Sequence, residues 1–219
     1  MRLFAAVRPP ADVLDHLETA LASVRAGTEP GPGRGPLRWT PPADRHVTVA
    51  FYGEVPQGRL DEVAQALDAA ASQVAPFAAS LSGAGLFDGR TLWVGCTGEG
   101  WAPLMAAAGD VGVGLGRPAD RRSRPHLTIA RARQGGGRQG TGRARPGGDR
   151  RRPGGPDPAA LAHALALYRG PGWTVGEVAL VESHLGAGPG GSPRHDVVHV
   201  APLGTGPGAL WQDVGRAQD

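Results

Sequence analysis

The chain has 219 residues, with 23 basic residues that are all arginine, 20 acidic residues and a net charge of +3 at pH 7. This length suits one sizeable domain or two small lobes, and either can bury a hydrophobic core. The single cysteine, Cys96, excludes an internal disulfide and a cysteine-based zinc site, while the mild positive charge permits an anionic partner without requiring one.

Apolar runs are short throughout the sequence. The N-terminal run at residues 3–7 is too short for a signal peptide, and no run approaches the roughly 18 apolar residues that span a bilayer. We therefore expect a soluble cytoplasmic protein that does not associate with a membrane.

The N-terminal region begins with a predicted strand and helix. Residues 3–7 form an apolar run closed by two prolines, which is typical of a strand that leads into a helix. Apolar residues then recur at helical spacing up to Gly27. A Gly/Pro-rich loop at residues 29–36 separates this helix from a short predicted strand at residues 37–39.

A second helix and a hairpin are predicted in the middle of the chain. Residues 60–71 have helical apolar spacing, and residues 77–86 and 91–96 are two predicted strands joined by a turn. Trp93 lies in the second of these strands, where we expect it to pack against a helix rather than to stack on a base.

The C-terminal half is expected to contain two further helices and two further strands. Residues 101–115 have the apolar density of a helix, although three glycines predict that it is short or frayed. A short helix at residues 159–168 precedes strands at 173–182 and 197–200.

Residues 134–158 consist almost wholly of Gly, Arg and Pro and show no apolar periodicity. Such a segment cannot bury enough apolar surface to offset its ordering entropy, so we expect a disordered insert. Its arginines could bind a phosphate backbone, but the insert lacks the aromatic residues on which single-stranded nucleic acid usually stacks. The simple loop is therefore the favoured interpretation.

Two predicted strands carry the same His-x-Thr motif, 80 residues apart. Their polar pairs, His46 with Thr48 and His126 with Thr128, alternate with aliphatic residues in the period of a half-buried strand. Side chains two residues apart on a strand share a face, so each strand presents an imidazole beside a hydroxyl. Because the helices lie between strands that can pair in antiparallel fashion, the order of elements favours an α+β fold over a parallel doubly wound sheet.

Two histidines and two hydroxyls that converge on one cleft suit the displacement at phosphorus in a cyclic phosphodiester. One imidazole can accept a proton from the attacking water while the other protonates the departing oxygen. Thr48 and Thr128 would donate hydrogen bonds to the non-bridging oxygens, whose charge must be held in the transition state. This scheme requires neither a metal nor another cofactor, and the sequence contains no HExxH motif and no cluster of paired aspartates.

With this pair of motifs the chain resembles the two-histidine phosphoesterase superfamily, and within it the RNA 2',3'-cyclic phosphodiesterase branch, also called the 2'-5' RNA ligase or LigT-like family. The similarity extends beyond the two motifs and covers nearly the whole chain outside the insert at 134–158. The similar segments are residues 1–7, 45–54, 92–94, 122–131, 181–186 and 197–203.

The resemblance implies a single domain over residues 1–219 with two pseudo-symmetric lobes. Each lobe would be an antiparallel sheet with helices on its outer face, and the active-site groove would lie between them. It also implies that the partner is an RNA or oligonucleotide with a cyclic phosphate end, and that the protein is a monomer.

The resemblance further implies that His46 is the proton donor to the leaving 3' oxygen and His126 the proton acceptor from water, which leaves a 2'-phosphate. Arg131 matches an arginine of the family that contacts the phosphate. Its spacing of five residues from His126 is odd, however, and places it on the opposite face of a regular strand.

The sequence departs from the family at His195, where the family commonly has tyrosine. We interpret this residue as structural or solvated, together with three other histidines: His163, His184 and His199. Two other functions use the same motifs: reversible 2'-5' ligation of RNA and non-catalytic nucleotide binding. The position of the reaction equilibrium separates ligation from hydrolysis, and the sequence does not determine it.

Overall fold

The computed structural model describes residues 1–25, 37–118, 124–132, 157–188 and 191–204. Most of the predicted insert at 134–158 lies outside the described residues. Only its last two residues are described: Asp157 caps a helix by accepting a hydrogen bond from the amide of Ala159, and Pro158 is the first residue of that helix.

The described helices are α1 (Ala11–Arg25), α2 (Leu60–Ala71), α3 (Trp101–Gly114) and α4 (Pro158–Ala164). The described strands are β1 (Arg2–Val7), β2 (Leu37–Trp39), β3 (Val47–Glu54), β4 (Phe77–Phe87), β5 (Thr91–Thr97), β6 (His126–Ala132), β7 (Arg169–Val175), β8 (Glu177–His184) and β9 (Arg194–Pro202). None of the helices in the described part of the chain has the length and hydropathy needed to span a bilayer.

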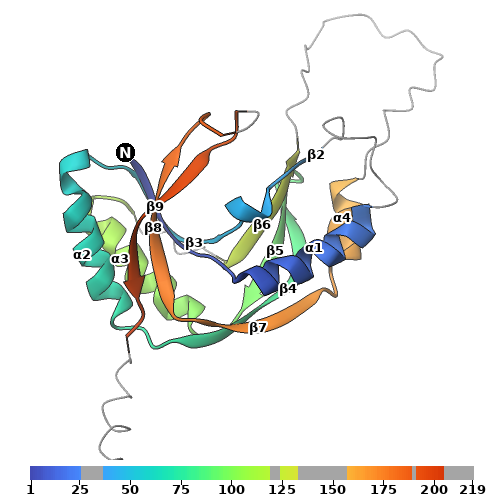
Figure 1. Ribbon diagram of the computed structural model, residues 1–219, viewed down its shortest axis with the longest axis horizontal. Coiled ribbons are helices and arrows are strands. Elements are labelled where there is room, and N and C mark those ends of the chain that lie inside the picture. Colours follow the sequence, from blue (N-terminus) through green and yellow to red (C-terminus); the bar gives the residue numbers. More distant parts are fainter. Residues whose placement is uncertain (26–36, 119–123, 133–156, 189–190, 205–219) are drawn as a thin grey trace, which may run out of the picture.

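The described strands form one strongly curled antiparallel sheet in the order β7-β4-β5-β6-β3-β1-β8-β9, with β2 also paired to β6 (Figure 1). The predicted α+β class with antiparallel pairing is confirmed. The expected division into two sheets is not observed, because β3 and β6 join the halves through one residue pair, Val47 and Leu127. The sheet is therefore continuous but narrowest at its centre.

The helices cover the outer side of the curl (Figure 1). Helices α1 and α4 pack on the half that contains β4, β5 and β7, whereas α2 and α3 pack on the half that contains β3, β8 and β9. The main hydrophobic core lies between these helices and the sheet. We call the opposite face of the sheet, inside the curl, the inner face; it carries a small separate cluster of Phe4, Ala6 and Val181.

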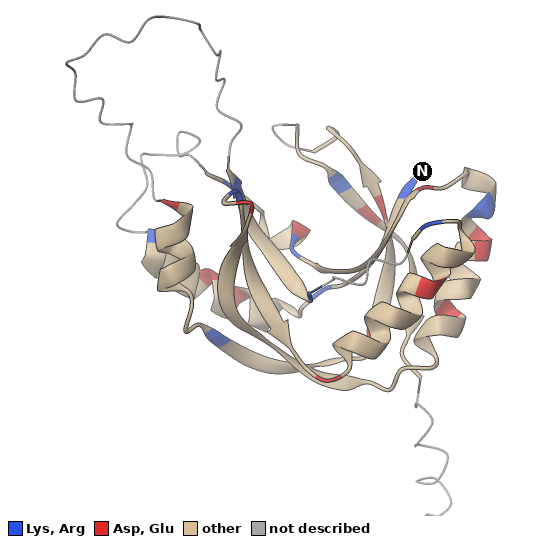
Figure 2. Ribbon diagram, turned by 180° about the vertical axis from the view of Figure 1, so that it is seen from behind, with Lys and Arg blue, Asp and Glu red and all other residues tan. Residues whose placement is uncertain are grey.

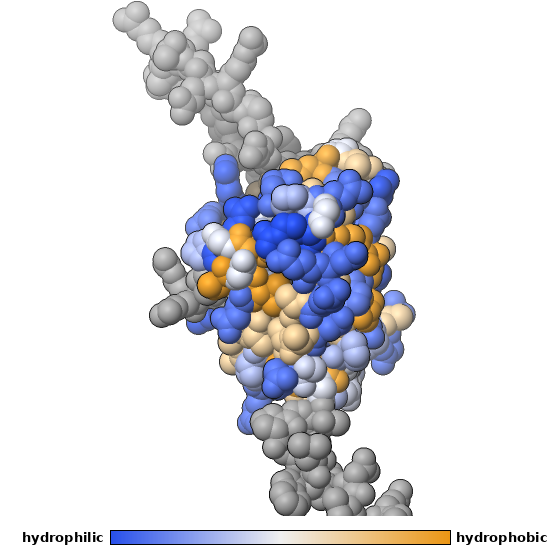
Figure 3. All heavy atoms as spheres, turned by 90° about the vertical axis from the view of Figure 1, so that its left-hand side faces the viewer, coloured by the Kyte–Doolittle hydropathy of each residue, from blue (hydrophilic) through white to orange (hydrophobic). Residues whose placement is uncertain are grey.

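Each helix directs one apolar side toward the core. Helix α2 buries Val63, Leu67 and Ala71 and leaves its acidic first turn in solvent. On the side of the molecule that carries α2, hydrophilic residues are interspersed with apolar ones (Figure 3). Cys96 is buried on β5, and burial raises the pKa of its thiol to about 12.

Two predicted elements differ in the structure. Helix α3 is not short, because buried side chains along its length, among them Trp101 and Leu104, outweigh the low helix propensity of its glycines. The predicted strand at residues 173–182 is two strands that separate at Gly176: β7 pairs with β4, and β8 pairs with β1. The chain thus crosses from one half of the sheet to the other at this point (Figure 1).

Leu127 offers a test of the junction between the two halves, since it is fully buried there. We expect Leu127→Ala to lower the free energy of unfolding by about 2–5 kcal/mol, through lost apolar burial and the cavity that remains. Urea denaturation followed by circular dichroism measures this change.

Leu185, whose side chain is 64% exposed, provides the matched control. Leu185→Ala should change the free energy of unfolding by less than about 0.5 kcal/mol. Equal effects of the two substitutions would contradict the placement of Leu127 in the core.

Candidate active site

The two His-x-Thr motifs meet at the centre of the sheet. Val47 and Leu127 form the antiparallel pair between β3 and β6, and both side chains are fully buried in the main core. Their sequence neighbours therefore point to the inner face. Residues that flank a matched antiparallel pair oppose each other in reverse order, which places His46 toward Thr128 and Thr48 toward His126. One apolar pair thus brings all four predicted residues together.

Both motif histidines are held in the same way. Nδ1 of His46 lies 2.9 Å from the carbonyl oxygen of Asp44, and Nδ1 of His126 lies 2.7 Å from that of Arg124. A carbonyl oxygen only accepts hydrogen bonds, so Nδ1 is the donor in each ring. In the neutral imidazole Nε2 then carries the lone pair and is the nitrogen available for proton transfer.

His46 lies in an apolar and cationic environment. Its ring packs against Phe4 at 4.9 Å and against the edge of His195 at 5.2 Å between ring centroids. Burial, followed by the charges of His195, Arg131 and Arg8, lowers the pKa of His46 to about 4, against the opposing effect of the bond to the Asp44 carbonyl. His46 is therefore neutral in the free protein at pH 7.

His195 is a neighbour of the first motif histidine that the local sequence pattern did not indicate. Its ring is half-buried and contacts both His46 and Phe4, at 5.3 Å between centroids for the latter, which is compatible with the expected structural role. Burial lowers the pKa of His195, and its Nδ1 atom is buried without a hydrogen-bond partner in the described part of the chain. The sequence held one indication of this placement: the family that the chain resembles commonly has an aromatic residue at the position of His195.

His126 has aromatic neighbours of its own. Phe87 contacts its ring edge-on at 4.8 Å, Trp93 lies at 6.3 Å, and the rings of Phe87 and Trp93 stack at 5.3 Å. The prediction that Trp93 packs against a helix is wrong. Its indole lies over Gly85, the residue paired with it on β4, where a Cβ atom would come within 2.4 Å of the ring. This glycine leaves room for the indole to lie flat on the inner face.

Arg131 reaches the inner face through a bulge in β6. The ladder between β5 and β6 pairs Trp93 with Thr128, Leu92 with Ala130 and Thr91 with Arg131. Ile129 is thus an extra residue, and both Ile129 and Ala130 are fully buried. The bulge shifts the alternation by one residue, so that Arg131 returns to the face of Thr128. The odd spacing in the sequence is therefore compatible with a place beside the motif.

A buried ion pair anchors the start of the first motif. The side chain of Arg45 is 1% exposed, pairs with Glu18 of α1 and donates a hydrogen bond from Nε to the Thr40 carbonyl at 3.1 Å. Glu18 also pairs with Arg25 at 3.1 Å. Because Arg45 precedes His46 in the chain, this network fixes the first histidine relative to α1. Arg45 lies in the segment 45–54 that resembles the family, but the local sequence pattern does not indicate this role.

A cavity of about 510 Å³ opens beside the junction. Thr48 and His126 line it together with Arg117, Arg124 and Phe87. Arg117, Arg124 and His126 are the basic side chains of a wall that is otherwise largely apolar, so an anionic group would bind at their side of the cavity. In the described part of the chain, His, Cys, Asp and Glu side chains form no group of three that could hold a metal ion.

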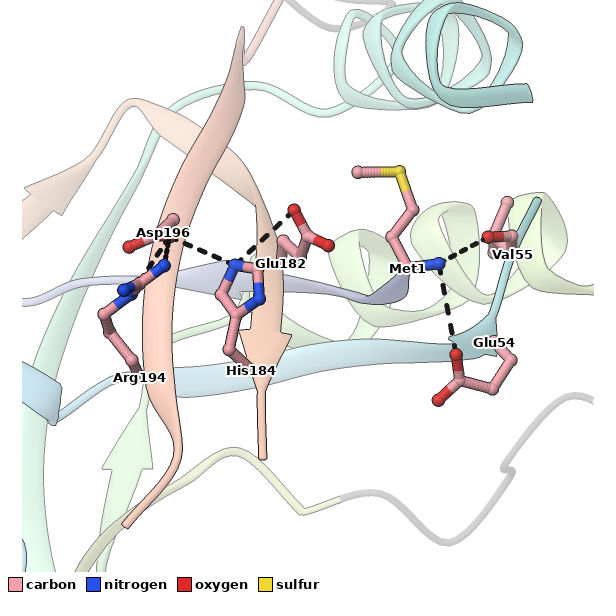
Figure 4. Close-up of polar contacts among 7 residues, drawn as sticks. All are labelled: Met1, Glu54, Val55, Glu182, His184, Arg194 and Asp196. Carbon is pink, nitrogen blue, oxygen red and sulfur yellow. Dashed lines mark hydrogen bonds and ion pairs between the residues drawn. The ribbon is translucent and has the colours of Figure 1, made fainter. Parts of the chain in front are cut away.

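The other histidines lie outside this arrangement. His163 is exposed on α4, and Nε2 of His199 pairs with Asp68 at 2.7 Å. Figure 4 shows His184 between the carboxylates of Glu182 and Asp196, at 3.6 and 3.1 Å, on the hairpin of β8 and β9.

Part of the chain matches known sequences. The sequence model of the family described as LigT like phosphoesterase matches residues 11–93. An RNA 2',3'-cyclic phosphodiesterase of Geobacillus stearothermophilus is 40% identical over 105 residues, which cover 44% of this chain and 33% of that protein. The match thus spans about a third of the length of this relative.

Two solved structures have similar folds. TT0787 of Thermus thermophilus superposes with a TM-score of 0.62 and 27% sequence identity, and the match covers 94% of this chain and 100% of that one. The E. coli LigT structure complexed with NADP+ has a TM-score of 0.62 and 20% identity, with coverage of 93% and 97%. At this lower identity the likeness shows the fold alone.

The lowered pKa of His46 predicts a pH-dependent stability. Above pH 6.5 the ring is neutral in both the folded and the unfolded chain, so its ionisation does not change the free energy of unfolding. Between pH 6.5 and about 4 the unfolded chain binds a proton that the folded chain does not, so the free energy of unfolding falls as the pH falls. From pH 7 to pH 4.5 we expect this residue to remove about 2–3 kcal/mol.

The measurement is the difference in unfolding free energy between wild type and His46→Gln, determined by urea denaturation at both pH values. The variant should lose less stability on acidification by that amount. His163→Gln, at an exposed position, serves as the control and should follow the wild type. A His46→Gln variant with the wild-type pH dependence would contradict the apolar environment described for this ring.

Proposed function

The chain belongs to the LigT-like phosphoesterase family, and from this premise we propose that it hydrolyses the terminal 2',3'-cyclic phosphate of RNA to a 2'-phosphate. The observation that carries the proposal is the convergence of both His-x-Thr motifs on the inner face. Each histidine there has its Nδ1 engaged by a carbonyl and its Nε2 available. The name of the Geobacillus relative supports the same substrate.

In the proposed mechanism His126 is the general base. Its Nε2 accepts a proton from water as the water oxygen bonds to phosphorus, and the bond from phosphorus to the 3' oxygen breaks. His46 donates the proton that the departing 3' oxygen takes up. Water and cyclic diester together give the 2'-phosphate and a 3'-hydroxyl, and the two rings then exchange protons with solvent to regain their starting states.

The proposed donor role requires that His46 become protonated when substrate is bound. Its pKa of about 4 in the free protein disfavours the charged ring at pH 7. The cyclic phosphate carries a negative charge, and an anion beside an imidazole favours the imidazolium form. Substrate binding therefore raises the pKa of His46, so that the ring is protonated in the complex and can act as the donor.

Three side chains are proposed to bind the phosphate. Thr48 and Thr128 donate hydroxyl hydrogen bonds to the non-bridging oxygens, and Arg131 adds a charge-assisted hydrogen bond that its position after the bulge permits. Such donors stabilise the transition state most because the charge on these oxygens increases there.

The proposal extends to the architecture of the protein. The four-strand series β7-β4-β5-β6 and β9-β8-β1-β3 meet at the Val47–Leu127 pair, and each carries two helices on its outer side. We take them as two pseudo-symmetric lobes of one domain over residues 1–219, with the catalytic groove between them. Each lobe contributes one His-x-Thr motif.

The function is tested with an RNA oligonucleotide that ends in a 2',3'-cyclic phosphate, incubated with the protein in EDTA. We expect complete conversion to the 2'-phosphate, identified by mass spectrometry and by its resistance to a 3'-specific phosphatase. Persistence of the cyclic end, dependence on added metal or a 3'-phosphate product would count against the mechanism. Formation of 2'-5'-linked RNA from two halves would indicate ligation instead.

The catalytic roles are tested with His46→Ala and His126→Ala. Each should lower kcat/KM on the cyclic phosphate by more than about 10²-fold, the usual loss of one acid or base. His163→Ala, which removes an exposed histidine, is the control and should retain wild-type activity.

The two roles separate on bis(4-nitrophenyl) phosphate, whose leaving group departs without a proton. His126→Ala should lose activity on this substrate as well, whereas His46→Ala should lose much less there than on the cyclic phosphate. The reverse pattern would assign the base to His46.

A further inference from the structure

Two arginines lie opposite each other at the end of the inner face. Strand β2 pairs with β6 such that Arg38 is the partner of Arg131, and both residues are exposed. Neither of them makes an ion pair with a carboxylate in the described part of the chain. Figure 2 shows basic positions gathered at this end of the sheet, where β2, β5 and β6 meet.

Both guanidinium groups belong to the face of the catalytic motifs. Directly opposed residues of an antiparallel ladder share a face, and the bulge after Thr128 brings Arg131 to the inner face. Leu37, the neighbour of Arg38 on β2, is buried in the main core, so the side chain of Arg38 points the opposite way. The pair thus continues the line of His126 and Thr128 along β6.

This arrangement is unfavourable for the protein alone. Like charges directly opposite on a ladder destabilise a sheet, and the strand backbones lie only about 4.8 Å apart. An anion between the guanidinium groups removes the repulsion and accepts hydrogen bonds from both. The pair is therefore suited to a phosphate.

A single phosphate at the catalytic motifs does not extend to both arginines of this pair. Arg131 lies four residues after Leu127 on β6 but only three positions along the ladder, because Ile129 is the extra residue of the bulge; this is roughly 10 Å at about 3.3 Å per residue. Arg131 is the nearer of the two to the motifs and its charge acts on the His46 ring. Arg38 lies directly opposite it on β2 and is not among the groups whose charges act on that ring, so we take Arg38 as the side chain available to a second phosphate.

We propose that Arg38 binds the phosphate on the 5' oxygen of the terminal nucleoside, which makes this chain selective for RNA ends over 2',3'-cyclic mononucleotides. The proposal rests on the function proposed above. When a 2'-phosphate is formed, the strand continues only from the 5' oxygen of the same nucleoside. The next phosphate of the substrate is therefore the ligand that extends along the sheet.

The test compares three substrates: uridine 2',3'-cyclic phosphate, its 5'-phosphorylated form and the dinucleotide UpU ending in a 2',3'-cyclic phosphate. Arg38→Gln should lower kcat/KM on the dinucleotide at least tenfold more than on the unphosphorylated mononucleotide, and the change should appear in KM. If Arg38→Gln lowers kcat/KM on the 5'-phosphorylated mononucleotide as much as on the dinucleotide, the side chain contacts the 5' phosphate itself. A loss confined to the dinucleotide overturns the phosphate contact and assigns it to the added nucleoside.

Two further variants complete the comparison. Arg131→Gln should weaken all three substrates, because it is proposed to contact the cyclic phosphate. Arg59→Gln removes the same charge at an exposed position just before α2 and should leave all three rates unchanged. A melting temperature of Arg38→Gln at or above that of the wild type shows that the fold is intact and agrees with the relief of repulsion.

A binding measurement separates this proposal from the proposed function. Fluorescence anisotropy with a labelled oligonucleotide that ends in a 2'-phosphate requires no turnover. Arg38→Gln should raise its Kd about tenfold and reduce the slope of log K against log salt by about 0.7, the value for one phosphate contact on a single strand. An unchanged Kd and slope, or equal losses of activity on all three substrates, would overturn the role of Arg38. Absence of turnover in wild type with this binding effect intact would overturn only the hydrolase.

Discussion

The whole site depends on one apolar contact between two strands. Val47 and Leu127 pair across β3 and β6 and bury their side chains in the main core, which forces the residues beside them to the inner face. The two histidines and two threonines are positioned by this burial and not by contacts with one another. Apolar packing therefore determines a polar arrangement, and it does so with little freedom, because a shift of register by one residue would turn every motif side chain into the core.

The described side chains of the inner face near the motifs carry positive charge that carboxylates do not balance, which favours binding of an anion. Burial and the nearby cationic groups hold His46 neutral, and Arg131 and Arg38 face each other on neighbouring strands without carboxylate partners in the described residues. Each feature lowers the stability of the free protein, the first on acidification and the second at any pH. A phosphate bound as proposed would reverse both effects, and its binding would then be thermodynamically linked to protonation of the proposed donor.

The scaffold holds this face rigidly from outside. The buried Arg45 side chain ties the start of the first motif to Glu18 of α1, a helix that packs on the opposite half of the sheet. The segment from β7 to β8 crosses between the halves and pairs with β4 at one end and β1 at the other. Both halves are therefore built from segments far apart in the chain, and neither motif is held by its own half alone. This cross-bracing is suited to holding two rings on either side of a single phosphorus atom.

The sequence alone determined what depends on local periodicity and on residue chemistry. The alternation around the two His-x-Thr motifs gave the strands, their exposed faces and the α+β class, because each rests on spacings of a few residues. Tertiary structure decided the rest. The extra residue Ile129 returns Arg131 to the inner face, Gly85 lets Trp93 lie flat beside His126, and the hairpin of β8 and β9 brings His195 to His46. Those positions are set by which strands pair and in what register, and pairing between segments far apart in the chain leaves no trace in a local pattern.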